Sequence, residues 1–247
     1  MDNEPVVNFI TAALCANEEL YELLHVKGLD ASHHHSFAIG AGGDVSAGID
    51  LEAEQIFIKH LLVFGEIVSE ESGVIPSLNA SARIILDPID GSDNLLSHLP
   101  YYGTSIAYFE GEKCTKAIIT NLANGDVFIK DEAGFRQGKI GKNSFENVTC
   151  NAFSKVGIFE RSYCSQKAHD TLQSAKIKYR SPGAFALSLA YAHDVSFVLY
   201  EGVMRSYDVE AGLFMCKDLH TFCEGDIFLV SKDKEIFDKI KSLFISN

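Results

Sequence analysis

Carboxylates at the end of an apolar segment are the residues of this chain best suited to chemistry. Asp87 and Asp90 follow the apolar residues 84–86, and Gly91 and Ser92 come directly after them. Carboxylate oxygens at a strand end can hold hard cations such as Mg²⁺, and the N–H groups of a following turn can face a phosphate. The same residue types also form ordinary turns, so a purely structural turn is the alternative for this segment taken alone.

The spacing of these two carboxylates excludes several other motifs. A D-x-D nucleophile does not fit, because two residues separate Asp87 from Asp90. An EF-hand loop that began at Asp87 would need Glu at its twelfth position, where His98 stands. The sequence also lacks a Walker loop. A site for hard cations beside a phosphate stays compatible with this spacing, as does an ordinary turn.

Three further acidic segments could join this group. Glu70 follows the apolar pair 67–68, with a solvated loop as the alternative. Asp50 and Glu54 are spaced as neighbours on one helix face, where like charges cost roughly 0.2–0.5 kcal/mol unless a cation lies near. Asp50 could instead simply favour a helix N-terminus. Asp208 fits a helix N-cap, which is its structural alternative.

Taken together, these segments resemble the inositol monophosphatase family, which belongs to a lithium-sensitive, magnesium-dependent phosphatase superfamily that includes fructose-1,6-bisphosphatases. The family's signatures are similar to G-E-E-S, D-P-[LI]-D-G-[ST] and W-D-x-A-A-G. The chain offers residues 69–72, 87–92 and 207–212 in that order. The resemblance extends over residues 38–230 and implies a Mg²⁺-dependent phosphatase.

The resemblance implies two Mg²⁺ sites. Glu70, Asp87 and the carbonyl of Ile89 would bind one ion. Asp87, Asp90 and Asp208 would bind the second. Carboxylates brought this close together cannot all stay ionised without cations, which agrees with the implied metal chemistry.

The resemblance also implies the residues that act on the phosphate. Asp50 and Ser92 would orient the attacking water, and Asp50 would lie near a third, weaker ion. Gly91 and Ser92 would offer backbone N–H groups to the phosphate. On the substrate side, Glu201 would bind a hydroxyl group, and the backbone of Gly183 and Ala184 would line the pocket.

We therefore predict a hydrolase that cleaves a small polyol or sugar phosphate monoester, first of all inositol 1-phosphate, by metal-activated water and without a phosphoenzyme. Fructose-1,6-bisphosphatase is the alternative, since the metal chemistry is shared. A 3′-phosphoadenosine phosphatase ranks lower, because Asp93 and Asn94 follow where that branch has Lys-Glu. An inactive, metal-binding regulatory homologue also remains, because Asp93 and Glu210 depart from the family pattern.

Composition limits the partners and the compartment. Of the 247 residues, 21 are Lys or Arg and 34 are Asp or Glu, for a formal net charge of −13. Such a charge repels nucleic acid and anionic membrane surfaces, so we expect neither as a partner. The six irregularly spaced cysteines indicate reduced thiols in a cytoplasmic protein. We expect no signal peptide and no membrane span, and the family resemblance implies a homodimer.

The elements that must position these residues follow from hydrophobic periodicity. We expect helices over residues 4–24, 50–64, 183–193, 208–217 and 233–244. Strands are predicted over 67–68, 83–86, 104–109, 116–120, 126–130, 156–159, 178–179, 195–200 and 227–230. Residues 28–48, with His33, His34 and His35, are predicted as a surface loop that binds no ligand.

This order of elements predicts a mixed fold of the α+β and α/β classes. Residues 1–147 form an α+β half with a largely antiparallel sheet and most metal ligands. Residues 148–247 form a smaller α/β half with Asp208 and the substrate pocket. The family resemblance implies a layered αβαβα sandwich for the whole chain.

Overall fold

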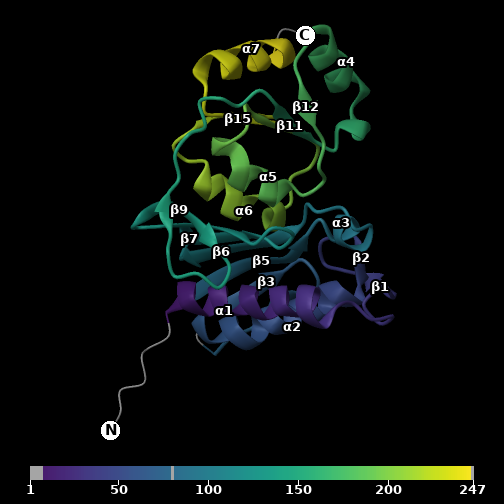
Figure 1. The fold of residues 1–247 in the computed structure, drawn as a ribbon, viewed down its shortest axis with the longest axis vertical. Helices are drawn as coiled ribbons and strands as arrows, with labels where there is room; N and C mark the ends of the chain where they lie inside the picture. The colour runs from purple at the N-terminus through teal and green to yellow at the C-terminus, as the bar shows by residue number, and fades with distance from the viewer. Residues whose placement is uncertain (1–7, 79–80, 246–247) are drawn as a thin grey trace.

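Five layers of helices and sheets stack on one another in the computed structural model, which describes residues 8–78 and 81–245. Helices cover the outer face of each sheet, and further helices lie between the two sheets (Figure 1). This arrangement confirms the predicted αβαβα sandwich. None of the helices in the described ranges is long and apolar enough to cross a membrane.

The first outer layer holds α1 (Phe9–Glu22) and α2 (Gly48–Leu61), which pack against each other. Asn8 caps α1 by accepting a hydrogen bond of 2.9 Å from the N–H of Thr11. Short turns, Leu23–Lys27 and Leu62–Phe64, continue the two helices. Both helices were predicted, although residues 4–7 of the first prediction lie outside the described residues.

The larger sheet has eight strands in the order β10-β9-β8-β7-β6-β5-β3-β4. Neighbours are antiparallel except β3 and β5, which are parallel. This confirms the predicted antiparallel sheet, to which the structure adds β4, β9 and β10. The strands are β3 (Glu66–Ser69), β4 (Gly73–Ile75), β5 (Ala82–Asp90), β6 (Gly103–Glu110), β7 (Lys113–Asn121), β8 (Asp126–Asp131), β9 (Gly134–Lys139) and β10 (Glu146–Asn147).

The segment predicted as a surface loop is more ordered than expected. It contains a two-stranded hairpin of β1 (Ser36–Ile39) and β2 (Val45–Ala47). His33 is buried, and its Nε2 lies 2.8 Å from a carboxylate oxygen of Glu52 on α2. The Nδ1 of the same ring accepts a 2.8 Å hydrogen bond from the N–H of Asp30. The loop prediction was therefore wrong for part of this segment, because contacts to α2 order it.

The smaller sheet has five strands in the order β12-β11-β13-β15-β14. The pairs that involve β11 are parallel, whereas β15 is antiparallel to both of its neighbours. Four of these strands were predicted, and β14 was not. The strands are β11 (Gly157–Glu160), β12 (Tyr179–Arg180), β13 (Val198–Glu201), β14 (His220–Glu224) and β15 (Ile227–Ser231).

Helices on both faces of this second sheet complete the layers (Figure 1). α5 (Phe185–Ala190) and α6 (Ser206–Met215) lie between the sheets. α4 (Gln166–Ser174), which was not predicted, and α7 (Lys234–Ile245) cover the outer face. The shorter turns are α3 (Ser92–Leu96), Ser162–Cys164 and Tyr191–His193.

Packing separates the two sheets into distinct cores. The apolar face of α7 packs on the smaller sheet, where Phe237 and Ile240 are buried. β10 ends at Asn147 and β11 begins at Gly157, so the two sheets use separate parts of the chain. The division into halves at residues 147 and 148 remains a prediction.

Candidate active site

Two parallel strands bring the acidic segments to one edge of the larger sheet. Glu70 comes directly after β3, and Asp87 lies near the end of β5. The N–H of Glu70 donates a 3.0 Å hydrogen bond to the carbonyl of Leu86, which aligns the two strand ends. Carboxyl ends of parallel strands meet at the same edge of a sheet, so these two side chains converge.

A helix from the other part of the chain supplies the third carboxylate. Asp208 lies in the first turn of α6, which packs on β5, β6 and β7. The hydroxyl of Ser105 on β6 donates a 3.1 Å hydrogen bond to the carbonyl of Tyr207 and so fixes the start of α6. Carboxylate oxygens of Glu70, Asp87 and Asp208 all lie within 4.8 Å of one another.

A β-bulge shapes the segment between Asp87 and Asp90. Asp87 pairs with Ser105 and Asp90 pairs with Gly103, so two residues of β5 oppose one residue of β6. The N–H of Ile89 donates a 3.0 Å hydrogen bond to Oδ1 of Asp87. Bulges redirect side chains at sheet edges, and here the bulge leaves Asp87, Ile89 and Asp90 along one cavity.

Burial strongly affects the pKa values of these carboxyl groups. Desolvation raises the pKa of Asp87 and of Asp90 well above the ordinary range, and neighbouring carboxylates raise both further. Burial raises the pKa of Glu70 to about 7 and also raises that of Asp208. Buried carboxylates that share one edge become ionised together only if cations compensate them. Oxygen ligands of this kind fit a hard divalent cation.

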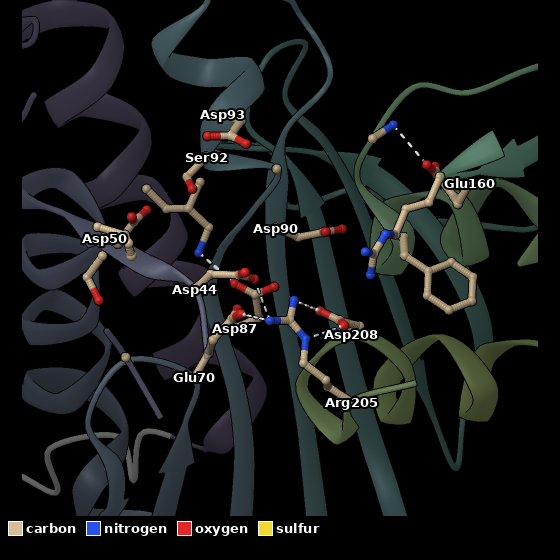
Figure 2. A pocket seen from close by; sticks show the side chains of 18 of the residues that line it. Asp44, Asp50, Glu70, Asp87, Asp90, Ser92, Asp93, Glu160, Arg205 and Asp208 are labelled. Atoms are coloured by element: carbon tan, nitrogen blue, oxygen red, sulfur yellow. Dashed lines mark hydrogen bonds and ion pairs between the residues drawn. The ribbon is translucent and has the colours of Figure 1, made fainter. Parts of the chain in front are cut away.

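The guanidinium group of Arg205 forms ion pairs with two carboxylates of this cluster, and it was not predicted. Its Nη1 lies 2.9 Å from Oε1 of Glu70, and its Nε lies 2.9 Å from Oδ2 of Asp208. Asp44, Glu70, Asp87 and Asp208 surround it in Figure 2. The spacing of Arg205 and Asp208, three residues apart at the start of a helix, is the signal that could have identified this pair.

Asp50 lies beside the cluster, near Ser92. It occupies the first turn of α2, and its Oδ2 accepts a 2.8 Å hydrogen bond from the N–H of Ala47. Its Oδ1 is buried and has no hydrogen-bond partner among the described residues. Burial raises the pKa of Asp50 to about 7, while the hydroxyl of Ser92 opposes that rise.

Glu54, which follows Asp50 by one helical turn, is held by Ser72. Glu54 is buried, and its two carboxylate oxygens accept hydrogen bonds of 3.0 and 2.5 Å from the N–H and hydroxyl of Ser72. Glu54 therefore holds the loop that follows Glu70. It is not among the described residues that line the cavity.

The predicted phosphate and substrate segments lie against each other: Gly91, Ser92 and Gly183 line the cavity, whereas Ala184 is not among the described residues that line it. Gly91 has a φ of +84°, and a Cβ atom there would lie 3.0 Å from Cβ of Ala184 and 3.2 Å from the carbonyl oxygen of Gly183. Glu160, which was not predicted, orders this segment: it accepts a 2.9 Å hydrogen bond from the N–H of Gly183. The sequence signal that could have identified Glu160 is its position as a carboxylate at the end of the apolar strand β11.

Glu201 lies apart from the other predicted residues. Its carboxylate accepts a hydrogen bond from the hydroxyl of Ser165, the N-cap residue of α4. It is not among the described residues that line the cavity, whereas its neighbour Tyr200 is. Its role in binding a substrate hydroxyl remains a prediction.

The cavity has a volume of about 460 Å³. Asp93, which departs from the family pattern, lines this cavity, whereas Glu210, another such residue, lines a separate groove with Phe214. Among the described residues, those lining the cavity that were not predicted include Asp44, Glu71, Glu160, Arg161, Tyr163, Phe185, Tyr200 and Arg205.

Comparisons with known proteins agree with this geometry. Residues 2–219 match the Inositol monophosphatase family. A fructose-1,6-bisphosphatase of Pyrococcus furiosus is 30% identical over 189 residues, which cover 73% of this chain and 70% of that protein. A fructose-1,6-bisphosphatase/inositol-1-monophosphatase of Thermococcus kodakarensis is 28% identical over 186 residues, or 71% of this chain and 68% of that protein.

A solved structure shows the same fold. The fructose-1,6-bisphosphatase of Leishmania major superposes with a TM-score of 0.79, covering 97% of this chain and 95% of that chain at 13% identity. The family match spans nearly the whole chain and includes all the carboxylates of the cluster. The chain therefore belongs to the inositol monophosphatase family and is a phosphoric monoester hydrolase.

Proposed function

We propose that this enzyme hydrolyses the phosphate monoester of a small polyol or sugar, with inositol 1-phosphate as the first expected substrate. The observation that carries the proposal is the cluster of Glu70, Asp87 and Asp208, with carboxylate oxygens within 4.8 Å of one another. These residues line a cavity of about 460 Å³, within the range of small-molecule sites.

Mg²⁺ is the cofactor that this donor set fits best. Glu70, Asp87 and the carbonyl of Ile89 would hold one ion, and Asp87, Asp90 and Asp208 would hold a second. Bound there, Mg²⁺ would neutralise the carboxylates, lower the pKa of a coordinated water and stabilise charge on the leaving oxygen. The raised pKa values of these buried carboxyl groups support the need for such cations.

Asp50 and Ser92 would orient the attacking water. The N–H of Ala47 holds one oxygen of Asp50, and the other oxygen is buried without a partner among the described residues. Burial raises the pKa of Asp50, and cations bound beside it would lower that pKa and keep the group ionised. The same carboxylate is the group near which a third, weaker ion would bind.

The phosphate and the rest of the substrate would occupy opposite parts of the cavity. Gly91 and Ser92, where α3 begins, would direct backbone N–H groups at the phosphate. The backbone of Gly183 and Ala184 would contact the polyol or sugar. To bind a hydroxyl group, Glu201 would have to exchange its hydrogen bond with Ser165 for one with the substrate.

Hydrolysis of fructose 1,6-bisphosphate is the second candidate function. The Pyrococcus furiosus and Thermococcus kodakarensis relatives are both named for that activity. Arg161 lines the same cavity, and a guanidinium group can bind a second phosphate bidentately.

Phosphate release with Mg²⁺ across a small substrate panel tests the proposal. The panel holds inositol 1-phosphate, fructose 1,6-bisphosphate, 3′-phosphoadenosine 5′-phosphate and a nucleoside monophosphate, with Asp208→Asn as the matched control. We expect turnover of one of the first two substrates and its loss in the folded variant. Turnover retained at the wild-type level in Asp208→Asn would refute the metal assignment.

The panel also decides between an enzyme of this specificity and an inactive regulatory homologue. Folded protein that binds Mg²⁺ but hydrolyses none of the four substrates would contradict the proposed function. Inhibition of any turnover by Li⁺ is a further expectation, as is a homodimer, which sedimentation velocity would detect.

A further inference from the structure

Arg205 contacts two of the carboxylates that the proposed divalent ions would bind. Nη1 of the guanidinium group lies 2.9 Å from Oε1 of Glu70. Nε lies 2.9 Å from Oδ2 of Asp208, and Nη2 lies 3.3 Å from Oδ1 of the same carboxylate. Both oxygens of Asp208 are therefore hydrogen-bonded to Arg205, and one oxygen of Glu70 forms an ion pair with it. These two residues belong to the cluster described above.

The same guanidinium group also holds the segment between β1 and β2. Nη1 lies 2.6 Å from Oδ2 of Asp44 and donates a 3.0 Å hydrogen bond to the carbonyl of Gly42. A Cβ atom on Gly42 would lie 2.5 Å from Cγ of Glu70, so this segment lies directly against a cluster residue. Arg205 thus connects α6, β3 and the β1–β2 segment through one side chain (Figure 2).

Because both are positively charged, Arg205 and a divalent ion compete for the same carboxylates. A guanidinium group stays protonated throughout the physiological pH range and cannot withdraw its charge when another cation arrives. The ion proposed for Glu70 and the ion proposed for Asp208 would each bind a carboxylate that Arg205 now contacts, and both ions would be repelled by its charge. Asp44 has an exposed side chain and lies outside the cluster, so it can keep its contact with Arg205.

We propose that Arg205 and the divalent ions are alternative partners of Glu70 and of Asp208, and that Arg205 thereby sets the metal affinity of the site. Ion binding releases the guanidinium group from these two carboxylates. Coupling between two ligands of one site is reciprocal, so the factor by which the ion weakens the Arg205 contacts is also the factor by which Arg205 weakens ion binding. Arg205 is a positioning residue in this proposal, which rests on the proposed function because it requires a divalent ion at the cluster.

Mn²⁺ binding, measured by electron paramagnetic resonance of the free ion, tests the exchange. Arg205→Met removes the competing guanidinium group, so the Kd for Mn²⁺ should fall about tenfold. Arg161→Met is the matched control. Arg161 lines the same cavity and lowers the pKa of Asp208 by its charge, but it forms no ion pair with the cluster within residues 8–78 and 81–245.

The two variants separate exchange from a general field effect. A fall in Kd confined to Arg205→Met supports the proposal. An equal fall in both variants, or an unchanged or larger Kd in Arg205→Met, overturns it. Wild-type protein that binds no Mn²⁺ would instead refute the proposed metal site itself, so the two failures are distinguishable.

A measurement on the wild-type protein avoids the question of whether the variant folds. The ¹⁵N–¹H signal of Arg205 Nε, assigned by its absence in Arg205→Lys, reports the hydrogen bond to Asp208. During a Mg²⁺ titration it should move toward the position of solvent-exposed arginines and saturate with the Kd of the ion. A signal that does not move at saturating Mg²⁺ would overturn the exchange.

Discussion

The main-chain N–H of Leu187 donates a hydrogen bond of 2.9 Å to Oδ2 of Asp90, across 97 residues of sequence. Asp90 ends β5 of the larger sheet, and Leu187 lies in the first turn of α5 between the two sheets. A helix from one part of the chain therefore orients a carboxylate from the other. The candidate site is complete only when α5 and α6 are packed on the larger sheet.

Substitutions of Asp90 should separate its charge from its hydrogen bond. Asp90→Asn keeps an oxygen that can accept the N–H of Leu187, so the free energy of unfolding should change by less than about 1 kcal/mol. Turnover with Mg²⁺ should fall at least about 100-fold, because a charged ligand is lost. Urea unfolding and phosphate release measure the two effects.

Asp90→Ala is the comparison for that variant. It leaves the buried N–H of Leu187 unpaired, which should cost about 1–3 kcal/mol of unfolding free energy in addition to activity. Wild-type turnover in Asp90→Asn would show that this carboxylate holds no ion.

Gly91→Ala should be more harmful than other substitutions at left-handed glycines. The new Cβ atom would lie 3.0 Å from Cβ of Ala184 and 3.2 Å from two carbonyl oxygens, in a backbone conformation that already disfavours side chains. Gly111→Ala is the matched control: its φ is +61°, and a Cβ atom there would meet nothing within 4 Å. Thermal unfolding measures both variants.

The control should lose about 1–2 kcal/mol from backbone strain alone. Gly91→Ala should lose more than that and should also lose turnover, because Ala184 and Gly183 must shift. Equal losses in the two variants would mean that the close approach at Gly91 has no energetic consequence.

Glu160 should affect substrate binding through the position of Gly183. Its buried carboxylate accepts hydrogen bonds from the N–H of Gly183 and the hydroxyl of Ser188. Glu160→Leu leaves both donors unpaired, so the free energy of unfolding should fall by about 1–3 kcal/mol. Because Gly183 would no longer be held in place, the substitution should also raise KM more than it lowers kcat. Steady-state kinetics and urea unfolding measure these changes.

Glu160→Gln is the conservative comparison. Its amide oxygen can still accept the hydrogen bond of Gly183, so KM should return toward the wild-type value. A loss of kcat with unchanged KM in both variants would contradict a positioning role.

His193 should make the folded protein sensitive to mild acid. Burial lowers the pKa of His193 to about 4, and its Nδ1 has no hydrogen-bond partner in the described part of the chain. The unfolded chain, with an ordinary histidine pKa of about 6.5, therefore binds the proton more readily. The contribution of His193 to the free energy of unfolding is therefore fully present above about pH 6.5. It is lost as the pH falls toward 4, by up to about 1.4 kcal/mol per pH unit.

His193→Gln removes this titration and should flatten that part of the stability profile. Urea unfolding of both proteins at several pH values between 4.5 and 7.5 gives the comparison, since all other titrating groups contribute equally to both. Parallel profiles for the two proteins would contradict the assignment.

The periodic spacing of apolar residues in the sequence predicted the helices and strands that bury one face regularly. The alternation of apolar residues identified most of the long strands, and the approximate helical stripes identified α1, α2, α6 and α7. Short edge strands such as β4, β10 and β14 were missed, because they are exposed or only partly buried and carry little periodic signal. The hairpin at Ser36–Ala47 was also missed, since it is glycine-rich and largely exposed.

By itself, the sequence determined the chemical character of the site: carboxylates at the ends of apolar strands, a glycine before a short helix, and the family to which these motifs belong. Only the tertiary structure decided which groups meet. It placed Glu160 against Gly183, Arg205 between Glu70 and Asp208, and Glu201 against Ser165. The physical reason is that ion pairs and hydrogen bonds between distant segments depend on how sheets and helices pack, whereas strand and turn preferences are properties of neighbouring residues.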